Sequence, residues 1–218
     1  MPYRQFQNLE EVAEYAQGLD ERWPEREAVA GHISGQLAGL SSRFSAQVSA
    51  PFLQVVELCT GPGRLAARLL ADHSHLFLTG FDISGPALAF ARARLAPYRG
   101  RFRLIQADLN QDGWLDQLPP VVHAVVSMQS LHDLGDECCV DRIYGLARRI
   151  LTPGGLFINA DLLAASPPDP KNPGRLPVQR HLALLQKHGF APVACTLQAG
   201  GFGCFVASVP EDRRPSSH

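Results

Sequence analysis

Hydrophobic residues in the middle of the chain form short runs that alternate with stretches of helical spacing. The runs predict buried strands at 52–58, 76–83, 101–109, 121–128 and 155–163. Apolar residues that recur every three or four positions predict helices at 63–73, 85–96 and 136–151, and a short helical turn at 113–118. Hydrophobic strands that alternate with helices are typical of a parallel sheet covered on both faces. The pattern therefore predicts a doubly wound α/β domain.

The beginning of the chain departs from this alternation. Two helices are predicted before the first strand, at 8–19 and 24–40. Asn8 followed three positions later by Glu11 fits a capping box at the start of the first helix. These helices are expected to form a helical cap segment over residues 1–45.

The end of the chain also departs from it. A loop rich in proline and polar residues is predicted over 166–177, followed by the helical stretch "VQRHLALLQKHG". Two strand-like runs, 191–198 and 201–209, are joined by too few residues for a crossover helix, so they predict an antiparallel hairpin. We therefore expect a mostly parallel seven-stranded sheet within one domain over 46–210, and then a polar tail over 211–218.

Composition limits the class of protein. A chain of 218 residues fits one ordinary domain, and a net charge of -1 gives no general attraction to nucleic acid or to an anionic membrane. No apolar run approaches the roughly 18 residues that a transmembrane helix needs. The five cysteines are odd in number and form no C-x-x-C pair, which favours a reducing cytoplasm over a disulfide frame or a structural zinc. We expect a cytoplasmic protein without a metal site; the oligomeric state is not indicated.

The glycine loop in "VELCTGPGRLA" is the first candidate for chemistry. Gly61, Gly63 and Ala66 satisfy G-x-G-x-x-A after a predicted strand, and Asp82 lies 21 residues beyond Gly61 at the end of the next strand. This spacing also fits a dinucleotide-binding fold, so the loop alone does not choose between cofactors.

Two further carboxylates favour one kind of ligand. Glu57 comes just before the glycine loop, where it would repel a pyrophosphate but attract a cation. Asp108 closes the third predicted strand and adds a second acidic group at the same edge of the sheet. A ligand with a positive centre, a ribose diol and an adenine, but no phosphate, fits these residues better than NAD does.

Together these residues resemble the class I S-adenosylmethionine-dependent methyltransferases over residues 54–209. "VELCTGPGRLA" is similar to the family's first motif, E/D-x-G-x-G-x-G, and "LTPGGLFINADLL" to its turn into the fifth strand. The chain departs from the first motif at Cys59, where a glycine is expected. The resemblance implies S-adenosylmethionine as the cofactor, held by Glu57, Cys59, Gly61, Gly63, Asp82, Ile83, Asp108, Leu109 and Ser127.

The resemblance also implies a role for each of these residues. Glu57 would close the motif's strand, and the two glycines would lie under the methionyl part of the cofactor, with Ser127 beside it. Asp82 would hold both ribose hydroxyls, and Ile83 would pack on the adenine. Asp108 would accept a hydrogen bond from the adenine amino group, and the backbone of Leu109 would meet the ring edge.

The segment "SMQSLHD" is expected to face the transferred methyl group. Gln129 and His132 are the polar groups expected nearest to a small-molecule acceptor, and Asn159 and Asp161, at the end of the fifth strand, are further candidates. His132 fits a general base by its ordinary pKa, and it fits a structural hydrogen-bonding role equally well. The segment lacks the N/D-P-P-Y/F pattern of enzymes that methylate exocyclic amino groups of bases. Whether the acceptor atom is oxygen, nitrogen or carbon is not determined.

Two alternatives stay open. A protein that binds S-adenosylmethionine or S-adenosylhomocysteine without catalysing transfer would show the same cofactor motifs. An NAD(P)-dependent oxidoreductase would share G-x-G-x-x-A, but it would need a catalytic Tyr-x-x-x-Lys or a similar group, which the sequence does not show.

Overall fold

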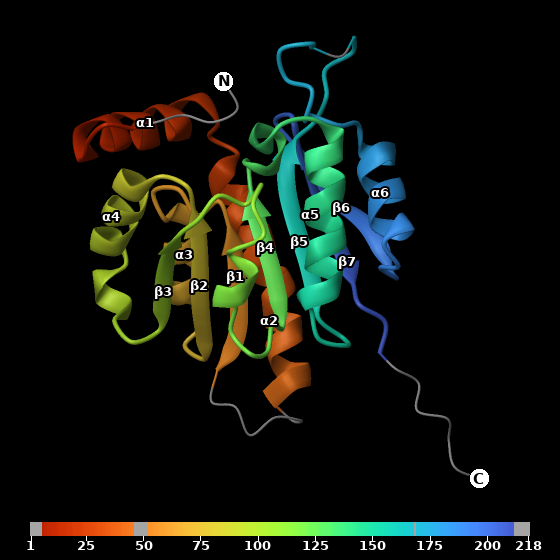
Figure 1. The fold of residues 1–218 in the computed structure, drawn as a ribbon, viewed down its shortest axis with the longest axis horizontal. Helices are drawn as coiled ribbons and strands as arrows, with labels where there is room; N and C mark the ends of the chain where they lie inside the picture. The colour runs from red at the N-terminus through yellow and green to blue at the C-terminus, as the bar shows by residue number, and fades with distance from the viewer. Residues whose placement is uncertain (1–5, 46–51, 168, 212–218) are drawn as a thin grey trace.

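A seven-stranded sheet forms the centre of the computed structural model, which describes residues 6–45, 52–167 and 169–211 (Figure 1). The strand order is β3-β2-β1-β4-β5-β7-β6. The strands are β1 (Leu53–Leu58), β2 (Leu76–Asp82), β3 (Phe102–Gln106), β4 (Ala124–Met128), β5 (Leu156–Leu162), β6 (Val193–Ala199) and β7 (Phe202–Ser208). All seven predicted strands are therefore confirmed, with ends that differ by a few residues.

Strand direction follows the prediction as well. The pairs β1–β2, β1–β4, β2–β3 and β4–β5 are parallel, whereas β7 is antiparallel to both β5 and β6. The terminal hairpin folds back so that β7, the last strand in the chain, lies between β5 and β6. The mostly parallel sheet with an antiparallel end hairpin is confirmed.

Helices cover both faces of the sheet (Figure 1). The α-helices are α1 (Leu9–Arg22), α2 (Arg26–Ser45), α3 (Arg64–Asp72), α4 (Gly85–Arg94), α5 (Glu137–Ile150) and α6 (Val178–Lys187). Short 3-10 helices are η1 (Ala96–Tyr98), η2 (Leu115–Gln117) and η3 (Leu131–Leu134). None of the helices in the described residues is long and apolar enough to span a bilayer.

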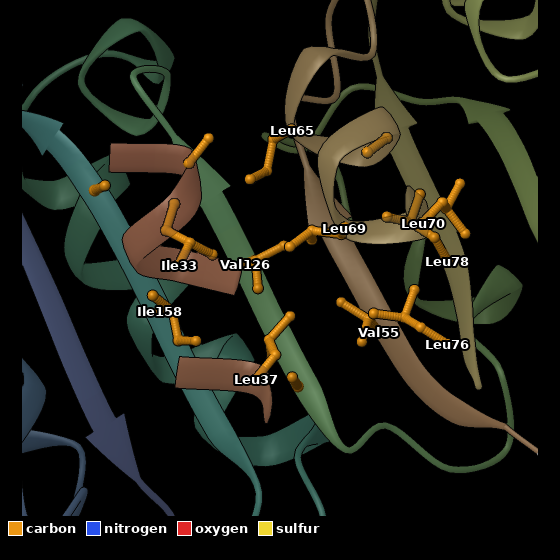
Figure 2. Close-up of a cluster of buried hydrophobic side chains, with 14 of the residues drawn as sticks. Ile33, Leu37, Val55, Leu65, Leu69, Leu70, Leu76, Leu78, Val126 and Ile158 are labelled. Atoms are coloured by element: carbon orange, nitrogen blue, oxygen red, sulfur yellow. The ribbon is translucent and has the colours of Figure 1, made fainter. Parts of the chain in front are cut away.

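One face of the sheet carries a core shared by α2, α3 and α4. Figure 2 shows Ile33 and Leu37 of α2 beside Leu65 and Leu69 of α3, packed over Val126 of β4 and its neighbours. These side chains are at most 2% exposed. The second predicted helix is therefore part of the main core, because its apolar side chains and those of the sheet bury each other from water.

The opposite face packs against α5 and α6. Neighbouring residues of one strand divide between the two faces: Val55 joins the first core and Val56 the second. This division follows from the two-residue period of a strand. Both faces of the central strands are buried, which explains their continuous hydrophobic runs.

The helix α1 lies differently, across the carboxyl-terminal edge of the sheet and next to α4 (Figure 1). Its N-cap is Asn8, whose side chain accepts a hydrogen bond from the Glu11 amide at 2.9 Å, as the capping box predicts. Val12 is the buried residue of this helix, whereas Tyr15 and Leu19 are half-buried. The expected boundary between the cap segment and the main domain is at residues 45 and 46. Residues 46–51 lie outside the described residues, and so does most of the expected tail.

Candidate functional site

A cavity lies where the carboxyl ends of β1, β2, β3 and β4 meet α1 and α2. It encloses about 1030 Å³, counting the part that is open to solvent. The expected cofactor residues that line it are Glu57, Cys59, Gly61, Asp82, Ile83, Asp108 and Leu109. In open α/β sheets, ligands bind at this edge of the sheet, where the strand order reverses. Here that point lies between β1 and β4.

The loop after β1 has two left-handed glycines with different surroundings. Gly61 has a φ of 53°, and a Cβ placed on it would meet nothing closer than the Cys59 carbonyl oxygen at 4.0 Å. Gly63 has a φ of 77°, and a Cβ there would lie 2.9 Å from the Ala91 Cβ of α4. Gly61 therefore leaves open space toward the cavity. Gly63 instead allows α3 and α4 to pack closely, and it does not line the cavity.

Cys59 occupies the position where the family's motif has its first glycine. Its φ of 55° is left-handed, a conformation that costs a residue with a Cβ about 1–2 kcal/mol. The departure from the motif is therefore at a position where glycine is favoured for conformational reasons. Burial raises the pKa of the thiol well above its ordinary value, and the Asp82 carboxylate raises it further, so the thiol is neutral.

Glu57 is a buried carboxyl group that faces the cavity. Its side chain is 3% exposed, and its Oε2 finds no hydrogen-bond partner in the described part of the chain. Burial raises the pKa of Glu57 to about 8, although the Thr60 hydroxyl and the Ala66 backbone partly oppose the shift. An uncompensated buried carboxyl of this kind either stays protonated or pairs with a cation.

Asp82, at the end of β2, is already held by the backbone. Its Oδ2 accepts the Gly61 N–H at 2.7 Å, and its Oδ1 accepts the Ser84 N–H at 2.9 Å. Burial raises the pKa of Asp82 despite these bonds. Each oxygen keeps a second lone pair for a ligand hydroxyl. Ile83, the next residue, adds an apolar side chain to the same wall.

The segment after β3 forms the next part of the wall. Asp108 Oδ1 accepts the Asn110 N–H at 2.9 Å, which fixes the carboxylate where it lines the cavity. Leu109 is 3% exposed, and its carbonyl accepts a hydrogen bond from Arg142 at 2.7 Å. That carbonyl is therefore already engaged within the protein.

The end of β4 places its polar residues unequally. Ser127 is fully buried, and its hydroxyl bonds the Ser130 hydroxyl at 3.0 Å, so it does not line the cavity. Gln129 does line the cavity and has a left-handed φ of 58°. Its N–H donates to the Ala160 carbonyl at 2.7 Å, and its side-chain oxygen accepts from Arg26 Nη1. Two strained non-glycine residues, Cys59 and Gln129, therefore border the same cavity, and strained residues cluster at functional sites.

His132 of η3 and Asp161 of β5 form a buried pair. The His132 Nδ1 lies 2.5 Å from Asp161 Oδ1, and the His132 amide donates to Asp161 Oδ2 at 3.0 Å. Burial favours the neutral ring, but the Asp161 carboxylate outweighs it and raises the pKa of His132. The pKa of Asp161 is lowered: burial opposes this change, but the histidine outweighs it.

The second ring nitrogen of His132 faces Asp133. The His132 Nε2 lies 3.3 Å from Asp133 Oδ1, and Asp133 rather than His132 lines the cavity. The loop before α6 packs on the other side, because a Cβ on Gly174 would lie 2.3 Å from the His132 carbonyl oxygen. His132 therefore borders the site behind Asp133.

Asn159 lies elsewhere, in the core on the α5 side of the sheet. Its side chain is fully buried and donates to the Tyr144 hydroxyl at 3.1 Å. The Tyr144 hydroxyl also lies 2.6 Å from His181 Nδ1. Asn159 does not line the cavity.

Arg26 is one of several residues lining the cavity that the sequence did not single out; Arg64 and Asp133 are others. Arg26 lines the cavity from the start of α2 and is 7% exposed. A single arginine at a helix start carries no local signal, because only the tertiary packing shows which side it faces. Among the described residues, no group of three or more histidine, cysteine or acidic side chains has the arrangement of a metal site.

Comparison with known proteins adds a family match over part of the chain and a fold. Residues 55–155 match the family described as "Methyltransferase domain". No curated protein matches the sequence. An O-methyltransferase family protein from Burkholderia thailandensis is 16% identical, with a TM-score of 0.64 over 94% of this chain and 73% of its own. Human N-acetylserotonin methyltransferase, solved in complex with S-adenosylmethionine, is 15% identical, with a TM-score of 0.58 over 88% of this chain and 58% of its own.

A structure named for a different activity shares the fold. The [4+2]-cyclase SpnF is 18% identical, with a TM-score of 0.58 over 82% of both chains. In two other matched methyltransferase structures, this chain spans only 51% and 50% of the matched chain. Identities this low show the fold alone. The strand order with antiparallel β7 and these structural likenesses together show the class I methyltransferase fold, and residues 55–155 within it match the methyltransferase-domain family.

Proposed function

We propose that this protein transfers the methyl group of S-adenosylmethionine to a small-molecule acceptor. The observation that carries the proposal is Asp82. It is a buried carboxylate that lines the cavity beside the open space at Gly61, and both of its oxygens can accept a further hydrogen bond. The match to a methyltransferase domain supports the reaction class.

The cavity residues fit the cofactor at both of its ends. Asp82 can accept both ribose hydroxyls, and Ile83 and Asp108 suit an adenine ring and its amino group. Glu57, buried and without a partner for Oε2, suits a positive charge. When bound, S-adenosylmethionine would supply a methyl group on a sulfonium, with a neutral thioether as leaving group. The protein's task is then to orient the acceptor and exclude water.

We assign the proton transfer, where the acceptor needs one, to His132. Asp161 receives the Nδ1–H and fixes the tautomer, so that Nε2 is the nitrogen that can accept a proton. Because the pair holds the pKa of His132 above its ordinary value, the ring becomes a free base only at correspondingly higher pH. The Asp133 carboxylate, 3.3 Å from Nε2, lies between this nitrogen and the cavity and must yield to the acceptor.

The test combines binding with turnover. Calorimetric titration should show S-adenosylmethionine binding, and a panel of hydroxylated, amino and carbon-nucleophile metabolites should yield S-adenosylhomocysteine with at least one acceptor. Asp82→Ala should weaken binding by about 1.5–3 kcal/mol, because a charged acceptor is lost. Asp116→Ala, at an exposed carboxylate outside the cavity, is the matched control. Unchanged affinity in Asp82→Ala would contradict the placement of the cofactor.

A second candidate is a protein that binds the cofactor without transferring its methyl group. Two observations favour keeping it: His132 stands behind Asp133 rather than in the cavity, and a [4+2]-cyclase has the same fold. Binding of S-adenosylmethionine without any S-adenosylhomocysteine formation across the panel would support this candidate. Binding of NADH without S-adenosylmethionine binding would support the oxidoreductase instead.

A further inference from the structure

Arg26, at the start of α2, and Gln129, directly after β4, bring hydrogen-bond donors to the cavity. Arg26 Nε donates to Asp20 Oδ1 at 3.3 Å, and Nη1 donates to Gln129 Oε1. A guanidinium has five N–H donors. Its remaining donors find no partner in the described part of the chain, and Arg26 lines the cavity, so these donors are available to a ligand.

The contact with Arg26 also decides what Gln129 offers. A guanidinium only donates, so Gln129 must turn its carbonyl oxygen toward Arg26 and its amide nitrogen away. That amide nitrogen has no partner among residues 6–45, 52–167 and 169–211, and Gln129 lines the cavity. The two side chains therefore present donors, and no acceptor, to the same space.

The charge of Arg26 is only partly balanced. Its carboxylate contact, Asp20, is shared with Arg64, which bonds Asp20 at 2.5 Å and Glu27 at 3.0 Å. Glu27 is in turn shared with Arg68. Burial lowers the pKa of Arg26, because its charge is removed from water and the Asp20 carboxylate that faces it is shared with Arg64. A bound anion would complete the neutralisation.

We propose that Arg26 and Gln129 form a carboxylate-binding subsite, a proposal that rests on the function proposed above. A planar guanidinium beside an amide N–H matches the two oxygens of a carboxylate. A phosphate is a poorer ligand, because Asp82 and Asp108 line the same cavity and repel a dianion more strongly than a single negative charge. The carboxylate belongs either to the amino-acid end of the cofactor or to an acidic acceptor.

The first arm of the test separates the two ends of the cofactor. S-adenosylhomocysteine has the amino-acid carboxylate, and 5′-methylthioadenosine lacks it. Calorimetric titration should show that Arg26→Gln weakens S-adenosylhomocysteine binding tenfold or more but changes 5′-methylthioadenosine binding less than threefold. Gln129→Glu should do the same, because its carboxylate would pair with Arg26 and occupy the subsite while preserving the contact that supports the fold. Arg68→Gln, in the same ion-pair network but outside the cavity, should alter neither affinity.

The second arm tests an acidic acceptor. Protein saturated with S-adenosylhomocysteine is titrated with benzoate and with uncharged benzamide. Binding of benzoate that is lost in Arg26→Gln and Gln129→Glu, with S-adenosylhomocysteine affinity unchanged, would assign the subsite to the acceptor. If no carboxylate dependence on Arg26 is found in either arm, or if both adenosine ligands weaken equally in the variants, the proposal is overturned. Failure of wild-type protein to bind either adenosine ligand would instead refute the proposed function.

Discussion

Replacing Glu57 with glutamine should make the ligand-free protein more stable at neutral pH. Burial raises the pKa of Glu57 from 4.5 to about 8, and this group therefore stabilises the fold least at high pH. Its contribution is fully present below pH 4.5 and is lost as the pH rises through about 8. Between pH 4.5 and pH 7 the loss is about 1.36 kcal/mol for each step of one in pH, so keeping Glu57 in the fold costs about 3 kcal/mol at pH 7. Glutamine has the same shape and does not titrate, so Glu57→Gln should remove this cost.

Urea unfolding of both proteins between pH 5 and 7.5 measures the effect. The free energy of unfolding of the wild type should fall by about 3 kcal/mol relative to the variant over this range. The comparison cancels all other titrating groups, because they are common to both proteins. If the free energy of unfolding changes with pH in the same way in both proteins, the pKa of Glu57 is not raised in the folded state.

The same residue links cofactor binding to pH. A cationic ligand beside Glu57 favours the carboxylate, so S-adenosylmethionine binding at pH 7 should release close to one proton, and its affinity should rise with pH up to about 8. Calorimetry in buffers of different ionisation enthalpy counts the proton. The Glu57→Gln variant should release none. Equal proton release in both proteins would mean that another group titrates on binding.

Three further changes test the rest of the site. His132→Ala should leave the Kd for S-adenosylmethionine within threefold but lower kcat roughly 10²–10⁴-fold. The wild-type rate should rise with pH through a pKa above the ordinary histidine value, and Asp161→Asn should move this rise in rate to lower pH. A wild-type rate that does not change with pH would exclude a base. Asp108→Ala should hardly change the melting temperature without ligand but should reduce the stabilisation by S-adenosylhomocysteine, and a large loss without ligand would show a structural role instead. In chemical denaturation, the free energy of unfolding of Cys59→Gly should lie within about 1 kcal/mol of the wild-type value, whereas that of Cys59→Val should be lower by about 2 kcal/mol or more. The reason is the φ of 55° at this position, which a β-branched residue adopts only with strain. Equal stability of the two variants would argue against backbone strain.

The sequence was sufficient for the sheet and for the acidic edge of the cavity. Buried strands and helices have different periods, so their order could be predicted, and a link too short for a crossover helix predicted the terminal hairpin. Parallel strands end at one edge of the sheet, which is why Glu57, Asp82 and Asp108 were expected together before any contact was known. The structure places all three on one cavity.

Other roles depended on neighbours that are distant in the chain. Gly63 serves the contact with Ala91 rather than the cavity, and Asn159 points into the core toward Tyr144, although both stand at positions that the sequence associates with the site. Periodicity and motif spacing place both residues near the strand ends, but they do not say whether a residue faces the cavity or a neighbouring element.

Only the tertiary structure brought Arg26 to Gln129 and His132 to Asp161, across 103 and 29 positions of the chain. Periodicity and turn chemistry act between residues a few positions apart, and they determined the elements and the edge at which the strands end. The partners of a charged side chain depend instead on how separate elements pack. That packing is decided by the shape and burial of the whole core, which no local pattern contains.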